Sequence, residues 1–333
     1  MDSPTPNIMK NLIITTISIL LLSVSTAHAT DPLPSWRNGP AKQLIISFIH
    51  KTTQPGSPDF VPIVDRIAVF DNDGTLWSEQ PNYVQLTFAI DRVKELAPKH
   101  PEWRVTQPFQ AVLEGDLQTL RQQGEHGLLK LITATHAGMS TTDYSKIVSD
   151  WLSKAVHPTH KRPYTELVYL PMLEVLSYFK RHGFKNYIVS GGGVEFMRPW
   201  TERVYGIPPE QVIGSSIKTK LVSRNGILEL IRLPEINFID DKADKPVAIH
   251  QFIGRRPIAA FGNSDGDLEM LQWVTAGSGT RLGVIIHHTD NEREVAYDRK
   301  SPVGRLDKAL NEAAIQNWLV VSMKSDWAQI FKQ

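Results

Sequence analysis

The 333-residue sequence contains no cysteine. This absence excludes disulfide bonds, thiolate catalysis, cysteine metal sites and the lipid anchor of a bacterial lipoprotein. An excess of either charge is also missing, because 36 Lys and Arg residues face 35 Asp and Glu residues. No long basic run, internal repeat or low-complexity tract is present, so a nucleic acid partner is not expected.

Long apolar runs are scarce, and the clearest one lies near the start of the chain. Lys10 precedes an apolar stretch from Leu12 to Val24, and Ala27-His28-Ala29 has the small-x-small form of a signal peptidase site. The stretch is shorter than the ~20 residues of a membrane span. We therefore expect residues 1–29 to be a signal peptide and the mature protein to be periplasmic, without stable membrane association. The alternative is an uncleaved membrane anchor.

The most informative stretch runs from Ile67 to Trp77. An apolar run of strand length ends in two carboxylates, Asp71 and Asp73, and Gly74 follows at once. Such a run is typical of a buried strand in a parallel sheet, and ligands bind beyond the carboxyl ends of such strands. Two acids beside a turn of free backbone N–H groups suit an anion held together with a divalent cation. A polar turn without further function is the alternative interpretation.

The rest of the chain alternates strand and helix patterns, which predicts a doubly wound, Rossmann-like parallel α/β sheet. We expect an N-terminal arm over 30–60, a catalytic core over 61–78 and 165–300, and a helical tail over 301–333. Residues 79–164 show helical periodicity and predict an inserted helical cap, the alternative being ordinary crossover helices. Asn225-Gly226 predicts the turn of a β-hairpin spanning 214–233.

Two further strands are predicted to end in polar clusters, and a lysine opens a helix between them. Ser190 is followed by Gly191, Gly192 and Gly193, and a later strand ends in Asn263, Asp265 and Asp267. Lys245 lies between these clusters in the chain. In a parallel sheet all of them meet at one edge, where they outline a phosphoryl-transfer site. A dinucleotide loop at Ser190 is disfavoured because a third glycine at the required spacing is missing.

The order of these motifs resembles the haloacid dehalogenase superfamily, in particular its phosphoserine-phosphatase-like branch with a helical cap. The resemblance implies that Asp71 is the nucleophile and that Asp73 is the general acid and base. It also implies that Ser190 and Gly191 bind the phosphoryl oxygens and that Lys245 neutralises charge, with Lys242 as the alternative lysine. Mg²⁺ is the implied cofactor, with Asp71, Asp73, Asn263 and Asp267 as its candidate ligands. Trp77 and Glu79 are weaker candidates for substrate contact.

One departure from the family pattern is Asn263, which stands where a metal-binding aspartate is usual. An uncharged ligand predicts weaker metal affinity unless Asp265 or Asp267 compensates. The function expected from the whole pattern is an exported Mg²⁺-dependent phosphatase acting on a small phosphorylated metabolite. The alternatives are a phosphotransferase to an alcohol and a phosphate-ligand binding protein without turnover.

Overall fold

The core of the protein is a seven-stranded sheet with the strand order β4-β3-β2-β1-β5-β6-β7. The computed structural model describes residues 1–2 and 31–332, and the chain from Pro32 onward forms one compact unit. The signal peptide predicted over 1–29 therefore lies almost wholly outside the described residues. The strands are β1 Ile67–Phe70, β2 Lys185–Gly193, β3 Val212–Arg224, β4 Ile227–Phe238, β5 Ala259–Gly262, β6 Leu282–His287 and β7 Leu319–Ser322. All neighbouring strands pair in parallel except β3 and β4.

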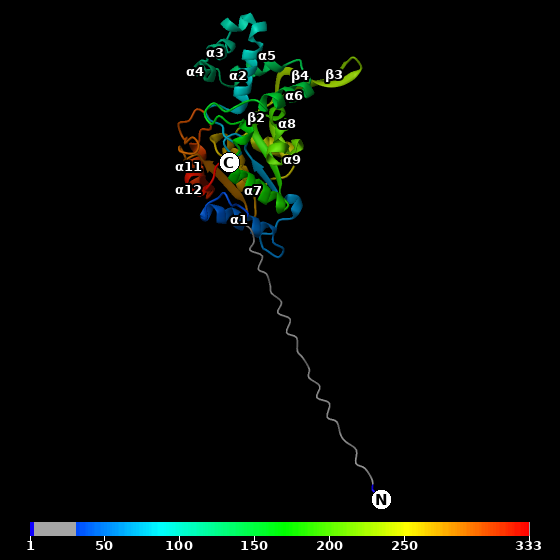
Figure 1. Cartoon of the computed structure of the whole chain (residues 1–333), viewed down its shortest axis with the longest axis vertical. Coiled ribbons are helices and arrows are strands. Elements are labelled where there is room, and N and C mark those ends of the chain that lie inside the picture. The colour runs from blue at the N-terminus through cyan, green and yellow to red at the C-terminus, as the bar shows by residue number, and fades with distance from the viewer. Residues whose placement is uncertain (3–30, 333) are drawn as a thin grey trace. The chain divides into compact units, whose positions relative to one another are not determined.

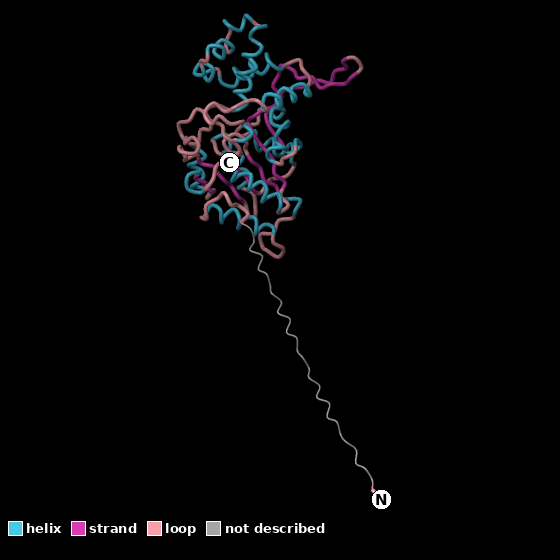
Figure 2. The backbone as a smooth tube through the Cα atoms, in the orientation of Figure 1, coloured by secondary structure: helices cyan, strands magenta, loops and turns pink. Residues whose placement is uncertain are grey.

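Helices cover both faces of this sheet, as expected for a doubly wound fold (Figures 1 and 2). Ala68 and Phe70 of β1 pack in one apolar cluster, whereas Val69 packs in the other. Strand side chains point alternately to opposite faces, so β1 is buried by helices on both sides. The predicted α/β fold class is confirmed. The helices are α1 Pro40–Thr53, α2 Val84–Leu96, α3 Phe109–Glu114, α4 Leu117–Gln122, α5 Gly124–His136, α6 Thr141–Leu152, α7 Leu170–Arg181, α8 Val194–Tyr205, α9 Asp244–Ile253, α10 Leu268–Thr275, α11 Lys308–Gln316 and α12 Met323–Asp326.

The segment between β1 and β2 is helical, and α2 to α5 lie together in the upper part of Figure 1. These helices share an apolar cluster of their own, in which Trp103 stacks on Phe109 with ring centroids 4.5 Å apart. Helix α6 begins with Ser140, whose hydroxyl accepts the Asp143 backbone N–H at 3.0 Å. The insertion thus carries its own core and reaches the sheet through α6.

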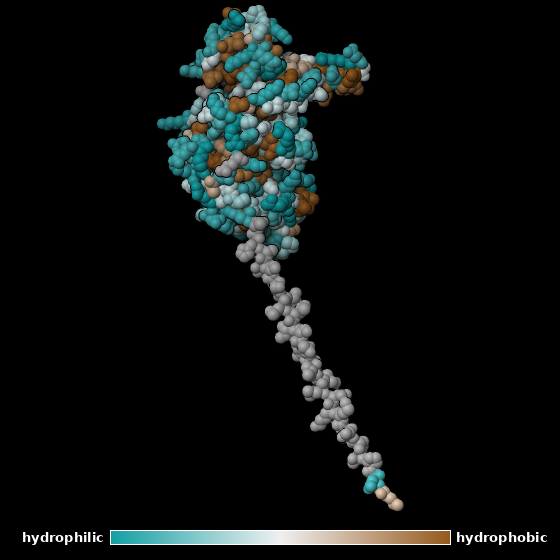
Figure 3. Space-filling view, in the orientation of Figure 1, coloured by the Kyte–Doolittle hydropathy of each residue, from teal (hydrophilic) through white to brown (hydrophobic). Residues whose placement is uncertain are grey.

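The predicted β-hairpin is confirmed as β3 and β4, which pair antiparallel around Asn225 and Gly226. Both turn residues have positive φ, 52° and 80°, as the tight hairpin turn requires. The hairpin projects from the sheet in Figure 2 and carries apolar surface in Figure 3. Its apolar residues Leu221, Ile227 and Leu228 are exposed.

One expectation about the second half of the chain is wrong. The segment 301–333 is not a purely helical tail, because Leu319–Ser322 forms β7 at the edge of the sheet. Trp318 and Trp327 of this segment are buried. Pro199 lies inside α8, which continues to Tyr205. Within residues 1–2 and 31–332, no helix has the length and apolarity to cross a membrane.

Candidate active site

A cavity of about 610 Å³ lies where the predicted motifs converge. The ends of β1 and β2, the start of α9 and the loop after β5 all contribute to its wall, as a parallel sheet predicts. The predicted site residues that line it are Asp71, Asp73, Glu79, Ser190, Gly191 and Lys245. The structure therefore brings together residues that are up to 174 positions apart in the chain.

Asp71 lies directly after β1 and contacts the only ammonium group among the cavity-lining residues of the described chain. Lys245 Nζ donates to Asp71 Oδ1 at 2.7 Å and to Asp267 Oδ1 at 2.5 Å. Burial lowers the pKa of an amine, but the carboxylates of Asp267, Asp71 and Asp240 raise the pKa of Lys245 above its ordinary value. Lys245 therefore stays charged. Its alternative, Lys242, is exposed and pairs with Asp241.

Asp73 is held by an indole rather than by an ammonium group. Trp77 Nε1 donates to Asp73 Oδ1 at 2.7 Å, and the Trp77 ring stacks on Trp200 with centroids 4.4 Å apart. Burial raises the pKa of Asp73 to about 6, although the Trp77 hydrogen bond and Lys245 lower it. Asp73 can therefore hold a proton at mildly acidic to neutral pH, as a general acid must. Trp77 itself is fully buried against Asp73 instead of lining the cavity.

Ser190 and the glycine loop, residues 191–193 at the end of β2, supply a hydroxyl and backbone groups to the cavity. The Gly192 N–H donates to Ser190 Oγ at 3.1 Å, and the Gly193 N–H donates to Gln85 Oε1 at 2.7 Å. A Cβ at Gly192 would lie 3.7 Å from Asp73 Oδ2, so this loop and the first motif approach each other closely. Gln85 belongs to α2, and it ties the helical insertion to the loop. Gln85 belongs to no recognisable motif and could not be predicted as a site residue.

The carboxylates of Asp265 and Asp267, in the acidic cluster after β5, accept several hydrogen bonds from backbone N–H groups. Asp267 Oδ2 accepts the backbone N–H groups of Asn263 and Ser264, both at 3.0 Å, while Oδ1 binds Lys245. Asp265 Oδ1 accepts the backbone N–H groups of Asp307 and Ala309 at the start of α11. Asp267 thus positions Lys245, and Asp265 caps a helix. The prediction that Asp267 binds a metal stays a prediction.

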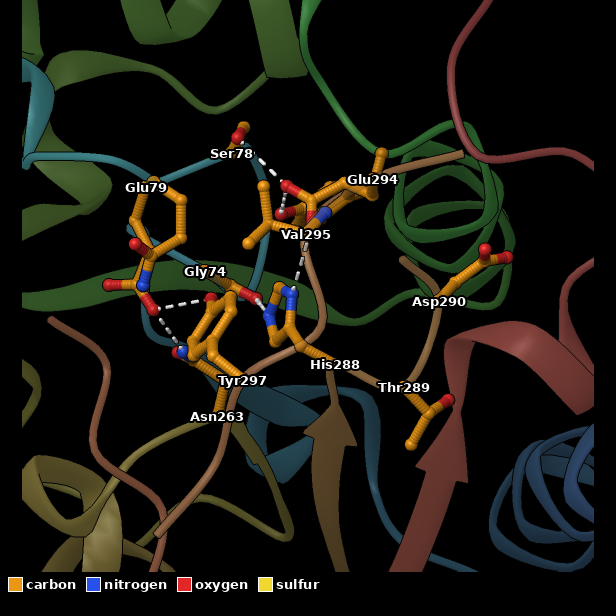
Figure 4. A network of polar contacts seen from close by, with 12 residues as sticks. Gly74, Ser78, Glu79, Asn263, His288, Thr289, Asp290, Glu294, Val295 and Tyr297 are labelled. Atoms are coloured by element: carbon orange, nitrogen blue, oxygen red, sulfur yellow. Dashed lines mark hydrogen bonds and ion pairs between the residues drawn. The ribbon is translucent and has the colours of Figure 1, made fainter. Parts of the chain in front are cut away.

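A buried polar network supports the first motif from the side of the loop after β6 (Figure 4). His288 Nε2 lies 2.7 Å from the Gly74 carbonyl oxygen, so this nitrogen is the donor. The other ring nitrogen lies 3.4 Å from Glu294 Oε2, and Glu294 Oε1 accepts the Ser78 hydroxyl at 2.9 Å. Burial raises the pKa of a carboxyl, but the hydrogen bond from His288 and its charge lower the pKa of Glu294. His288, the residue directly after β6, thus supports the first motif.

The cavity carries more buried negative than positive charge. Burial raises the pKa of Asp71, an effect that Asp267 increases and Lys245 opposes, and burial also raises the pKa of Glu79. Such a donor set of oxygens, with one ammonium group against several carboxylates, fits a hard divalent cation such as Mg²⁺. No three His, Cys, Asp or Glu side chains of the described chain are arranged to hold a metal on their own. Carbonyl, amide or water oxygens are therefore needed as well.

His157 and Arg198 lie away from the cavity lining. His157 is buried, with Nε2 2.6 Å from the Gln80 carbonyl oxygen. Arg198 donates to the carbonyl oxygens of Pro209 and Val212 and therefore supports the chain before β3.

Comparison with known proteins decides the family. The sequence profile of the haloacid dehalogenase-like hydrolases matches residues 68–272, well over half of the chain. The protein belongs to this family. Its membership confirms the predicted superfamily and the prediction that the chain is a hydrolase.

Three individual proteins with which this haloacid dehalogenase-like hydrolase was compared differ in how much of each chain is similar. A structure of a protein with unknown function from Bordetella pertussis Tohama I is 16% identical, covers 77% of this chain and 97% of that one, and gives a TM-score of 0.48. A phosphoserine phosphohydrolase-like protein from Francisella tularensis is 15% identical over 75% of this chain and 98% of that one, with a TM-score of 0.35. A methylthioribose-1-phosphate isomerase from Gloeobacter violaceus is 34% identical over 122 residues, and the match spans about a third of its length (32%). The substrate therefore has to be inferred from the site itself.

Proposed function

We propose that the protein is an exported, Mg²⁺-dependent phosphatase that hydrolyses a small phosphomonoester through phosphoryl transfer to Asp71. The observation that carries this proposal is the Asp71 carboxylate in the cavity wall, with one oxygen held by Lys245 and with Asp73, Ser190 and the glycine loop beside it. A nucleophile, an acid and anion-binding donors around one space are the parts that phosphoryl transfer requires.

The reaction follows from these groups in two steps. The Asp71 oxygen that Lys245 does not hold attacks phosphorus, and the bond from phosphorus to the alcohol oxygen breaks. Asp73 gives its proton to that oxygen, so the neutral alcohol leaves. Asp73 then takes a proton from a water molecule, which attacks phosphorus and releases phosphate with the Asp71 carboxylate restored.

The groups around Asp71 offset the negative charge of the phosphoryl group. The Ser190 hydroxyl and the Gly191 amide donate hydrogen bonds to its oxygens, while Lys245 supplies a positive charge. A bound Mg²⁺ would add positive charge beside the same oxygens. The Asp71 carboxylate and the Asp73 backbone carbonyl are among the groups that would hold it.

The walls of the cavity indicate the kind of alcohol that leaves. The insertion contributes an apolar surface consisting of Leu86, Leu120, Ile132 and Tyr144. Arg232 also lines the cavity, but it pairs with Glu195 and lies over the Tyr144 ring, 3.6 Å from its centroid. This pair is neutral overall, so the cavity favours an apolar or aromatic alcohol over one that carries a second anion.

The test is phosphate release from phenyl phosphate and from glycerol phosphate, with Mg²⁺ or with a chelator. We expect metal-dependent turnover with phenyl phosphate preferred, and a loss of at least ~10³-fold in Asp71→Asn. Lys245→Ala should lose at least ~10²-fold, whereas its matched control Lys242→Ala should keep full activity. Turnover that survives in Asp71→Asn would refute the nucleophile. Transfer of the phosphoryl group to an added alcohol would instead favour a phosphotransferase. Tight binding of the phosphate ester without turnover would favour a binding protein.

The proposed export rests on the leader alone. Residues 1–29 combine a basic start, a short apolar stretch and a small-x-small site. N-terminal sequencing of the protein from a periplasmic extract should begin at Thr30. A chain that keeps Met1 and sediments with membranes would contradict export by cleavage.

A further inference from the structure

The side chain of Glu79 is buried beside the first motif and contacts the residue that departs from the family pattern. Glu79 Oε1 accepts the Asn263 Nδ2–H at 2.7 Å and the Tyr297 hydroxyl at 2.6 Å (Figure 4). Glu79 is 1% exposed, yet it lines the same cavity as Asp71 and Asp73. A buried carboxylate is therefore fixed at the edge of the reaction space.

The amide of Asn263 leaves this side of the cavity without an anionic oxygen of its own. Asn263 Oδ1 accepts the Thr75 hydroxyl at 3.0 Å, and Nδ2 faces Glu79. Because the Thr75 hydroxyl donates to Oδ1 of Asn263, the group of Asn263 that faces Glu79 is the NH₂ group. The carboxyl group that an aspartate would provide at position 263 stands instead one hydrogen bond away, on Glu79.

The backbone of the first motif lies directly against this pair. A Cβ at Gly74 would approach Asn263 Nδ2 to 2.1 Å and Glu79 Oε1 to 2.4 Å, so any other residue at this position would displace both groups. Both hydrogen bonds to Glu79 end on Oε1, and no described residue donates to Oε2. One oxygen of Glu79 is thus held in place and the other is left for a ligand.

We propose that Glu79 supplies the second anionic side chain of the Mg²⁺ site, in place of the charge that Asn263 lacks. The inference rests on the proposed function, because it concerns the cation of that same site. Asp71 and Glu79 then provide two carboxylates, and the Asp73 carbonyl and water complete a set of oxygens, consistent with Mg²⁺ bound through one or two carboxylates. Tyr297 and Asn263 are positioning residues that hold Glu79.

The test is calorimetric titration of the purified mature chain with Mg²⁺, without any phosphate ester. Glu79→Gln should weaken Mg²⁺ binding at least about tenfold, and Glu79→Gln combined with Asn263→Asp should restore it to within about threefold of the natural protein. Glu195→Gln is the matched control, because it removes one carboxylate from the same cavity without touching the first motif, and its Mg²⁺ affinity should stay unchanged.

The single variant Asn263→Asp keeps the test decisive if Glu79→Gln does not fold. Since Glu79 already supplies the charge, this variant should change the Mg²⁺ affinity less than about threefold. Tenfold tighter binding, or equal binding by natural protein and a folded Glu79→Gln, would overturn the role of Glu79 and leave the phosphatase proposal standing. Absence of Mg²⁺ binding by the natural protein would refute the metal dependence itself and this role with it.

Discussion

At the scale of single residues, the Trp77 indole determines how Asp73 is oriented. Its N–H donates to Asp73 Oδ1, while its ring is fixed between the core and Trp200. A general acid and base has to face the same bond in both steps of the reaction, and a fixed hydrogen bond on one oxygen leaves the other oxygen for the proton. Trp77 was predicted as a substrate contact, but the structure assigns it this positioning contact.

Removal of the Trp77 N–H should slow the reaction, because Asp73 then loses its fixed hydrogen bond. Trp77→Phe keeps the aromatic packing and removes only the N–H, so kcat should fall about fivefold with little change in KM, since a lost hydrogen bond is worth ~1 kcal/mol. Steady-state kinetics with phenyl phosphate measures both constants. Trp200→Phe is the control, because its indole donates to the Phe196 carbonyl oxygen and not to Asp73. Equal effects of the two substitutions would mean that packing alone is responsible.

At the scale of elements, three helices of the insertion meet at a buried histidine. His136 of α5 stacks on Phe88 of α2 with centroids 5.0 Å apart and lies edge-on to Tyr144 of α6. Burial, together with the charges of Arg232 and Arg92, lowers the pKa of His136 to about 3. His136 is therefore neutral in the folded insertion over the whole physiological pH range.

Stability should consequently depend on pH through this histidine. In the unfolded chain His136 binds a proton below its ordinary pKa of 6.5, whereas in the folded protein its pKa is about 3. The contribution of neutral His136 to the free energy of unfolding is therefore fully present above pH 6.5 and decreases as the pH falls through this window. Between pH 7.5 and pH 5, protonation of His136 in the unfolded chain should lower the free energy of unfolding of the natural protein by about 2 kcal/mol. Urea unfolding at both pH values measures this decrease, which should be smaller by about 2 kcal/mol in His136→Phe. An unchanged loss would contradict a buried neutral His136.

Position within a helix or strand also decides which site residues could be predicted from the sequence. Asp71, Ser190 and Lys245 were predictable because each lies at the end of a strand or the start of a helix, where local pattern fixes position. Gln85 and Arg232, which line the cavity, and Tyr297, which contacts Glu79, were not predictable, because they come from distant segments that carry no motif. The strand β7 was also missed, since a four-residue edge strand between short helices has too few residues to show a period.

At the scale of the whole molecule, the segment before α1 and the C-terminal segment pack against each other. Trp36 forms a β-bridge with Trp327, and their rings meet edge-to-face with centroids 5.9 Å apart. The Arg37 N–H donates to the Asp326 carbonyl oxygen at 2.7 Å. Because Tyr169, just before α7, packs on Trp327 as well, these terminal segments belong to the main apolar core.

Loss of this contact should destabilise the molecule as a whole. Trp327 is fully buried, so Trp327→Ala should lower the free energy of unfolding by ~3–5 kcal/mol. Ile315→Ala is the control, since Ile315 is 71% exposed and its loss should change stability by less than ~0.5 kcal/mol. Urea unfolding followed by circular dichroism measures both. A loss below ~1 kcal/mol in Trp327→Ala would show that the terminal segments add little to the core.

The central claim is that Asp71 carries the phosphoryl group during the reaction. The most direct measurement is an acid quench of the enzyme during turnover of phenyl phosphate, followed by mass spectrometry of its peptides. We predict one phosphoryl group on the peptide that contains Asp71 and none in Asp71→Asn. A phosphoryl group on any other residue, or undiminished phosphate release by Asp71→Asn, would contradict the mechanism.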